Sequence, residues 1–262
     1  MKIVIAPDSF KESLDALAVA KAIEAGFKRV FPHAQYDLIP MADGGEGTVQ
    51  SLVDATQGRI ERVSVTGPLG ECVRAFFGVS GDGKTAFIEM SAASGLHLVP
   101  VAQRNPLTTT SYGTGELIKA ALDQGAKHII LGLGGSATND GGMGVACALG
   151  AEFLDADGRI LPPAAESLGR VTRISTEHMD PRVKDVNFTI LCDVDNPLCG
   201  PHGASHIFGK QKGADEAMRN VLDGYLKRYA DIVKRDLHMD VVDVPGAGAA
   251  GGMGGGVLLL PD

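Results

Sequence analysis

Apolar and polar positions follow two different periods over the first sixty residues. Residues 2–5 form a short apolar run, and residues 16–30 carry apolar side chains at the three- and four-residue spacing of a helix. Residues 36–40 predict a second strand, and a second helix begins near Val49. Strands and helices that alternate with short connections are typical of a parallel sheet with helices on its faces.

After about residue 60, hairpin patterns join the helical ones. Residues 72–79 and 84–90 are rich in β-forming residues, and the sequence GDG at 81–83 predicts a tight turn between them. The remaining pattern predicts buried strands over 128–133 and 188–192, a second hairpin over 153–161, and helices from Thr114 and over 214–235. We therefore expect an α/β fold with two α/β domains. Residues 1–60 would begin a parallel-sheet domain, and residues 61–262 would form a second domain with a mixed sheet.

Composition and charge narrow the classes of partner. The chain has 262 residues, 44% of them hydrophobic, and its formal net charge is −8. An acidic balance disfavours a nucleic acid or an anionic membrane as the partner, and no apolar run is long enough to span a bilayer. The four cysteines lie far apart, which excludes zinc-binding spacing and favours a reduced, cytoplasmic protein. An anionic ligand must therefore be held by local cations, backbone amides or a metal ion.

Familiar nucleotide-binding motifs fail in their context. Residues 78–85 match the P-loop pattern, but a strand rather than a helix follows the lysine, so we interpret this segment as a hairpin. Residues 132–137 and 246–251 resemble the dinucleotide-binding fingerprint. The first is followed by Asp140, which would lie badly beside a pyrophosphate, and no βαβ unit follows the second. These matches are weak indications of NAD binding.

Polar loops that follow predicted strands carry the candidate chemistry. They cover residues 6–13, 40–48, 132–142 and 192–197. Any one of them could be an ordinary turn or helix cap, because Asp, Ser and Gly are common in both. Ligands of α/β proteins, however, bind beyond the carboxyl ends of the strands. Two glycine-rich loops and two acidic clusters together predict phosphoryl transfer.

Each loop supplies a different part of that chemistry. Backbone amides of loop 132–142 could approach phosphate oxygens, and Ser136 and Thr138 add hydroxyl donors. Asp193 and Asp195 are hard oxygen ligands of the kind that Mg²⁺ takes when it also binds nucleotide phosphates. A carboxylate such as that of Asp8 could take a substrate hydroxyl proton, and Lys11 could neutralise a substrate carboxylate or the moving phosphoryl group. The residues alone leave open which carboxylate is the base.

The same loops resemble the glycerate kinase family of bacterial glycerate metabolism. The resemblance lies in IAPDSFKES at 5–13, PMADGGEGT at 40–48, GLGGSATNDGGMG at 132–144 and CDVDNPLCGP at 192–201. Shorter stretches at 89–96, 110–116 and 245–252 also match, so the resemblance covers the chain in order. It implies phosphorylation of D-glycerate by ATP with Mg²⁺, with 2-phosphoglycerate as the favoured product and 3-phosphoglycerate as the other. It also implies an incomplete flavodoxin-like domain and a restriction-enzyme-like domain with the active site between them.

Residue roles follow from matching these motifs position by position. We expect Asp8, Lys11 and Asp193 to be catalytic, and Asp193, Asp195 and Asp140 to bind the metal. The expected substrate and ATP ligands are Ser9, Asp43, Gly44, Gly45, Glu46, Gly134, Gly135, Ser136, Thr138 and Asn139.

The sequence departs from the family at its end. The family continues past the Gly/Ala segment at 246–256 with a further loop that resembles Thr-Gly-Glu-Gly and has no counterpart here. We therefore expect the 262-residue chain alone to be inactive or weakly active. Two other functions remain open: a non-catalytic phosphate- or nucleotide-binding module, and an NAD-dependent hydroxy-acid dehydrogenase.

Overall fold

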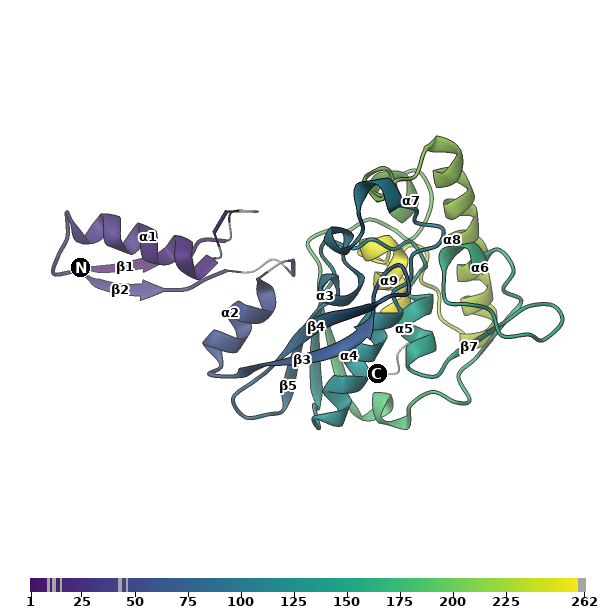
Figure 1. The fold of residues 1–262 in the computed structure, drawn as a ribbon, viewed down its shortest axis with the longest axis horizontal. Coiled ribbons are helices and arrows are strands. Elements are labelled where there is room, and N and C mark those ends of the chain that lie inside the picture. The colour runs from purple at the N-terminus through teal and green to yellow at the C-terminus, as the bar shows by residue number, and fades with distance from the viewer. Residues whose placement is uncertain (9, 11–12, 15, 42–43, 46, 259–262) are drawn as a thin grey trace.

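The first part of the chain is a small βαβ unit. The computed structural model describes residues 1–262 except 9, 11–12, 15, 42–43, 46 and 259–262. Strands β1 (Lys2–Ile5) and β2 (Gln35–Leu38) pair in parallel, and helix α1 (Ala16–Lys28) connects them. This order agrees with the sequence pattern, and Figure 1 shows the unit projecting from the rest of the chain.

The larger part is built on a mixed five-stranded sheet in the order β3-β4-β5-β6-β9. Its strands are β3 (Arg59–Thr66), β4 (Cys72–Val79), β5 (Thr85–Glu89), β6 (His128–Gly132) and β9 (Asn187–Leu191). The first three are antiparallel, whereas β5, β6 and β9 run parallel. The predicted hairpin is confirmed, because β4 and β5 pair around the turn at 81–83, and residues 78–85 are therefore not a P-loop. The chain thus has the expected mixed α/β fold.

Helices pack on this sheet and in a second core beside it. They are α2 (Thr48–Ala55), α3 (Ser91–Ser94), α4 (Tyr112–Asp123), α5 (Met143–Ala148), α6 (Ala165–Leu168), α7 (Ala204–Phe208), α8 (Glu216–Leu237) and α9 (Ala249–Val257). Short 3₁₀ helices are η1 (Leu96–Leu98), η2 (Val101–Gln103), η3 (Pro181–Asp185) and η4 (Lys210–Lys212). The main core packs α4, α5 and α9 against the sheet, through residues such as Leu117, Ile129 and Met253. Within the described ranges, no helix is long and apolar enough to cross a membrane.

The second predicted hairpin is shorter than expected. Strand β7 (Glu152–Leu154) pairs with β8 (Arg173–Ser175), and within 153–161 the return segment makes a bridge from Ile160 to Leu154. The reason is the side chain of Asp155, which accepts hydrogen bonds from the amides of Asp157 and Arg159, both at 2.9 Å. This local turn uses the amides that would otherwise begin a second strand.

Helix α2 belongs to the packing of the larger sheet. Val49 and Val53 are buried against Phe87 of β5. The amide of Val49 donates to the buried carboxylate of Glu89 at 2.8 Å, which joins the start of α2 to the end of β5. The domain boundary predicted near residue 60 follows α2 in the sequence, and α2 itself packs on the larger sheet.

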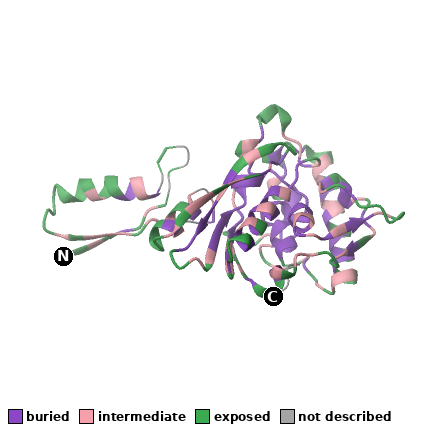
Figure 2. Cartoon of the chain, turned by 60° about the horizontal axis from the view of Figure 1, so that its bottom comes forward, coloured by how far each residue is buried: buried purple, intermediate pink, exposed green. Residues whose placement is uncertain are grey.

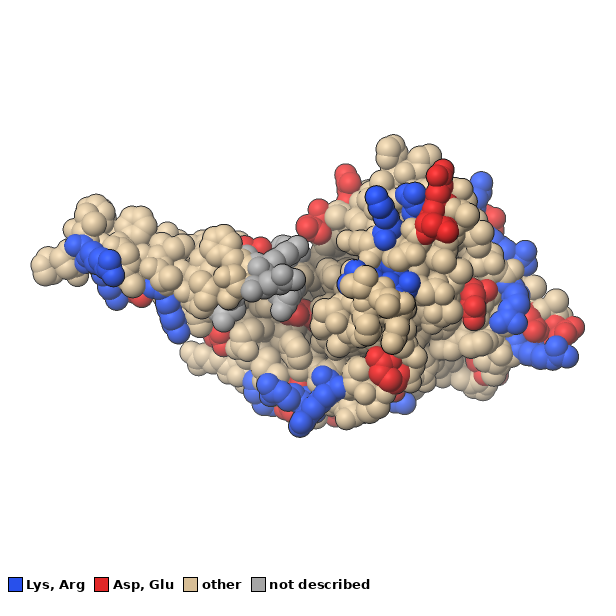
Figure 3. Space-filling view, turned by 45° about the horizontal axis from the view of Figure 1, so that its top comes forward, with Lys and Arg blue, Asp and Glu red and all other residues tan. Residues whose placement is uncertain are grey.

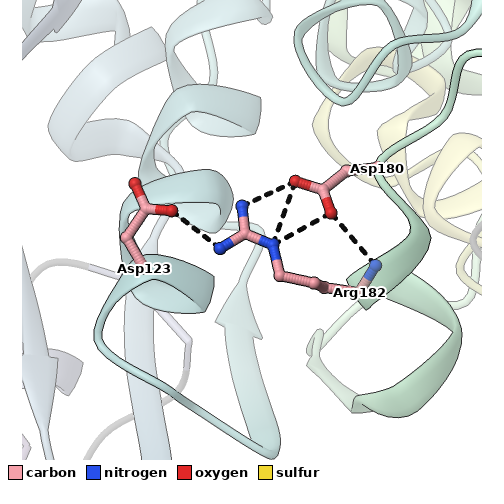
Figure 4. A network of polar contacts seen from close by, with 3 residues as sticks. All are labelled: Asp123, Asp180 and Arg182. Carbon is pink, nitrogen blue, oxygen red and sulfur yellow. Dashed lines mark hydrogen bonds and ion pairs between the residues drawn. The ribbon is translucent and has the colours of Figure 1, made fainter.

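Exposure differs between the two parts, as Figure 2 shows. The described strands and helix of the βαβ unit are mostly exposed or half-buried, whereas the larger part has a continuous buried interior. At the far edge of that interior, Arg182 joins two segments (Figure 4). Its guanidinium donates to Asp123 at the end of α4 at 2.7 Å and to Asp180 before η3 at 2.6 Å. The hydrogen bonds from the Arg182 guanidinium to Asp180 hold the pKa of that carboxyl below its ordinary value.

Candidate active site

Three of the predicted loops meet beyond the carboxyl ends of β6 and β9. The amide of Gly134 donates to the carbonyl of Gly44 at 3.2 Å, and the amide of Leu133 donates to the carbonyl of Leu191 at 3.1 Å. The approach is close enough to require glycine, because a Cβ at Gly132 would lie 2.3 Å from the Gly44 carbonyl oxygen. Loop 44–48 and loop 132–142 are therefore in backbone contact, and loop 192–197 begins beside them, as the parallel strand order predicts.

The glycine-rich loop is held at several points by its neighbours. The amide of Leu96 donates to the carbonyl of Gly135 at 2.8 Å, and the amide of Ala137 donates to the carbonyl of Ser94 at 2.9 Å. The hydroxyl of Thr109 donates to the carbonyl of Ala137 at 3.0 Å. Most carbonyls of the loop are thus turned toward the protein and have donors there. A loop fixed in this way needs little reorganisation to bind a ligand.

Several donors of this loop have no acceptor. Among the described residues, the amides of Gly135, Ser136 and Thr138 donate to no backbone or side-chain oxygen. The buried hydroxyl of Thr138 also lacks a partner. Ser136 and Thr138 are buried, and unpaired buried N–H groups are rare in proteins, whereas Gly135 is exposed. Gly135 has φ 75°, and a left-handed residue within a loop lets successive amides point to one side and bind an anion.

Asp140 is a buried residue of this loop, and its carboxylate accepts four hydrogen bonds. It is completely buried, and its carboxylate accepts from the amide and hydroxyl of Ser111 at 2.9 and 2.7 Å. The amides of Gly142 and Gly144 also donate to it, each at 3.2 Å. Burial raises its pKa, and these hydrogen bonds oppose that rise. The geometry favours a role in positioning the loop, because binding a metal would displace bonds already made.

Asn139 is also buried, and its side chain spans two segments. Its Nδ2 donates to the hydroxyl of Ser205 in α7 at 3.0 Å, and its Oδ1 has no hydrogen-bond partner in the described part of the chain. The last residues of the loop contact α9, where the amide of Gly141 donates to the carbonyl of Gly251 at 3.1 Å. The Gly/Ala segment at 246–256 is therefore a packing surface for the glycine-rich loop.

Lys212 is the functional candidate that sequence reasoning missed. It is 1% exposed, and its ammonium donates to the hydroxyl of Ser136 at 2.7 Å and to the carbonyl of Thr138 at 2.6 Å. Burial lowers its pKa from 10.5 to about 7, and the charge of Asp140 acts in the opposite direction. No sequence pattern joins Lys212 to the loop, because the contact spans more than seventy residues and comes from a single 3₁₀ turn.

The acidic loop after β9 presents its carboxylates to solvent. Asp193 and Asp195 are both exposed, and no described cation forms an ion pair with either. The loop itself is fixed by Asn196, whose Nδ2 donates to the carbonyl of His202 at 2.8 Å. Exposed carboxylates fit Mg²⁺, which keeps several waters and shares its coordination with substrate phosphates. Within the described residues, no group of three His, Cys, Asp or Glu side chains forms a closed metal site.

The remaining predicted residues lie at the carboxyl ends of β1 and β2. Asp8 is exposed after β1, and the carbonyl of Pro7 accepts from the amide of Met41 at 2.9 Å, which brings these two loops together. Gly44 and Gly45 belong to the loop that contacts Gly134. Four predicted residues lie outside the described ones: Ser9, Lys11, Asp43 and Glu46.

The fold and this loop define an α/β protein whose convergent strand ends surround a set of unpaired amide donors. The chain matches the profile of the Glycerate kinase family over residues 3–261. It is 62% identical to glycerate kinase of Haemophilus influenzae over 261 residues, which is 100% of this chain and 69% of that protein. It is 60% identical to glycerate 2-kinase of Escherichia coli K12 over 98% of this chain and 68% of that protein.

A solved structure agrees with these sequences. The crystal structure assigned to glycerate kinase 2 of Salmonella typhimurium LT2 superposes with a TM-score of 0.93 at 56% identity, covering 99% of this chain and 70% of that one. The chain therefore belongs to the glycerate kinase family, and it is a phosphotransferase.

Proposed function

We propose that this protein transfers the γ-phosphoryl group of ATP to D-glycerate and forms 2-phosphoglycerate. The resemblance of the loops and the name of the E. coli relative, glycerate 2-kinase, support the substrate and the position of transfer. The observation that carries the proposal is the set of unpaired donors at Gly135, Ser136 and Thr138, of which Ser136 and Thr138 are buried and Gly135 is exposed. Such donors need an acceptor, and phosphate oxygens are the acceptors that a kinase brings to its site.

The loops divide the work of the reaction between them. In this proposal, the amides of loop 132–142 bind the nucleotide phosphates, and Asp193 and Asp195 hold Mg²⁺, which supplies positive charge to the phosphates when it is bound. Asp140 stays out of the metal site, because its oxygens already accept hydrogen bonds. Asp8 accepts the proton of the glycerate hydroxyl, and Lys11 neutralises the substrate carboxylate or the moving phosphoryl group. Catalysis is then mostly positioning and charge stabilisation.

The two-domain arrangement belongs to the same proposal. Asp8, Lys11 and Asp43 come from the βαβ unit and the segment after it, whereas the phosphate loop and the acidic loop come from the larger sheet. Glycerate would then bind where these two parts meet, and the nucleotide would bind on the larger part. We also propose that the protein works in the cytoplasm, which its four free cysteines support.

The test replaces Asp193 with Asn and measures phosphorylation of D-glycerate by MgATP. It uses the 262-residue chain and a form extended by the part of the E. coli relative that the chain does not cover. Loss of one metal carboxylate should lower kcat about a hundredfold or more. Asp157→Asn, an exposed carboxylate in the turn after β7, is the matched control and should leave kcat unchanged. Full activity of the Asp193→Asn form would remove Asp193 from the mechanism.

The same variants distinguish the alternatives. A phosphate-binding module without catalysis should bind MgATP as well or better when the charge of Asp193 is removed. A dehydrogenase should bind NAD in preference to ATP. The glycine-rich loop gives no reason to expect this, because the carboxylate of Asp140 already accepts hydrogen bonds from the amides of Gly142 and Gly144 at the start of α5, where a pyrophosphate would bind.

A further inference from the structure

The acidic chain has to compensate the charge of a bound nucleotide. Its formal net charge is −8, so the charge of the molecule opposes an anionic ligand. On the face drawn in Figure 3, acidic and basic side chains are interspersed and form no broad basic patch. A local cation near the glycine-rich loop would therefore have a large effect on affinity. Lys212 is such a cation, and it lies behind the loop rather than in front of it.

Burial of this ammonium is costly, and the loop supplies only two acceptors for it. A buried lysine without an ion-pair partner is uncommon, because the charged form loses its hydration. In the described part of the chain, Asp140 carries the charge that acts on Lys212, and it favours the ammonium without contacting it directly. A residue of this kind is a poor choice for stability alone. The negative charge of a bound ligand, added to that of Asp140, would offset the cost of burying this ammonium.

The contacts of Lys212 also determine which way the loop faces. The ammonium donates a hydrogen bond to the carbonyl oxygen of Thr138, which would otherwise repel a phosphate. It donates to the oxygen of Ser136, so the hydroxyl hydrogen of Ser136 remains available as a donor. Both contacts lie among the residues whose amides are unpaired. The turn that carries Lys212 is fixed by Arg104, whose guanidinium donates to the carbonyl of Gln211 at 3.2 Å.

We propose that Lys212 is a positioning residue of the nucleotide-phosphate site: its buried ammonium holds Ser136 and the Thr138 carbonyl on the inner side of the loop and compensates a bound phosphate from behind. This inference rests on the proposed function, because it takes the loop as the phosphate site. Lys212 contacts no substrate and acts through Ser136 and the loop backbone.

The test is a double-mutant cycle on MgATP affinity. Lys212→Met, Ser136→Ala and the double variant are compared with the wild-type chain by titration calorimetry. Lys212→Met should weaken MgATP binding about tenfold or more, because the loop loses its charge and its inner anchor. Ser136→Ala should weaken binding in the wild type and add nothing when Lys212 is already replaced. The matched control is Lys210→Met, an exposed lysine in the same 3₁₀ turn, which should stay within about twofold of the wild type.

A purely structural role for Lys212 predicts a different result. Lys212→Met would then change thermal stability but bind MgATP like the wild type, or the two single effects would add. Either result overturns the proposal. If the wild-type chain binds no MgATP, the nucleotide site itself is wrong and both proposals fail. Equal affinity in the wild type and the Lys212→Met variant overturns this inference alone.

A second measurement needs no variant. A bound phosphate should favour the ammonium form of Lys212, so binding of MgATP at pH 8 should take up part of a proton. Titrations in two buffers with different ionisation enthalpies report this uptake. If Lys212→Met fails to fold, Lys212→Gln replaces it in the cycle. Absence of proton uptake by the wild-type chain would overturn the proposal.

Discussion

Lys212 and Asp140 are buried on the inner side of the same loop and carry opposite charges, but they are held differently. Asp140 accepts hydrogen bonds from two amides within its own segment and from both donors of Ser111. Lys212 has the hydroxyl of Ser136 and one carbonyl. Burial lowers the pKa of Lys212 to about 7, and the charge of Asp140 opposes that shift. This shift makes Lys212 the residue whose titration should be visible in the stability of the fold.

The stability of the chain should rise with pH because of Lys212. Its pKa is about 7 in the folded state and 10.5 when unfolded, so between these values the unfolded chain binds more protons. Unfolding then becomes harder as pH rises, and the cost of burying the charge falls by about 2 kcal/mol from pH 7 to pH 9. Urea unfolding of the wild type and Lys212→Met at both pH values measures this slope. A stability difference between the two that does not change with pH would contradict it.

At the level of helices and strands, contacts between the loops that follow the strands determine the geometry of the candidate site. Strands β6 and β9 end side by side, and the loop that leaves β6 contacts loop 44–48 through a backbone hydrogen bond from Gly134 to Gly44. Gly132 and Gly134 are the positions that allow this approach, since a Cβ at either would lie within 3 Å of the Gly44–Gly45 backbone. Helix α9 supports the loop from the other side through residues 251–256.

Gly132→Ala should separate these loops. Its Cβ would lie 2.3 Å from the Gly44 carbonyl oxygen, so the backbone must shift and stability should fall by about 1–3 kcal/mol. Affinity for MgATP should fall as well, because the shift displaces the amides after it. The control is Gly224→Ala in α8, where a Cβ meets nothing within 4 Å, and it should stabilise the chain by about 0.5–1 kcal/mol. Normal MgATP affinity in Gly132→Ala would show that loop contact does not position the site.

Much of this arrangement follows from sequence pattern. The alternation of strands and helices predicted the mixed α/β fold, and the rule that ligands bind at strand ends predicted that loops 40–48, 132–142 and 192–197 would carry the site. Local sequence patterns could not predict the contacts of Lys212, because these contacts depend on where the tertiary fold places η4. They also could not show that Asp140 is buried, since an aspartate after a glycine-rich loop has the same sequence signature when it faces a metal ion.

The two parts of the chain differ in how much apolar surface they bury. In the βαβ unit and the segments beside it, Val4, Phe10, Phe27 and Val30 are between 42% and 69% exposed. The larger sheet instead encloses Phe77, Ile88, Ile129 and Leu131, each at most 1% exposed. Local stability depends on this burial, so the two parts should open independently.

Hydrogen exchange should reveal that difference. Amides of β1 and β2 have a thin core behind them, and we expect them to exchange at least about a hundredfold faster than amides of β5 and β6. Mass spectrometry on peptic fragments of the native chain measures both in one experiment. MgATP should slow exchange in loop 132–142 and leave β1 and β2 little changed. Equal protection of the amides in β1 and β2 and of those in β5 and β6 would contradict the independent opening of the two parts.

Formation of 2-phosphoglycerate is the most direct test of the proposed function. D-glycerate, ATP and Mg²⁺ are supplied to the 262-residue chain and to the extended form, and enolase with pyruvate kinase reports the product without a mutase. We expect a glycerate-dependent signal from the extended form. A signal that appears only after a mutase is added would assign the 3-phospho product instead. No product from either form, with or without the mutase, would contradict the assignment of glycerate as the substrate.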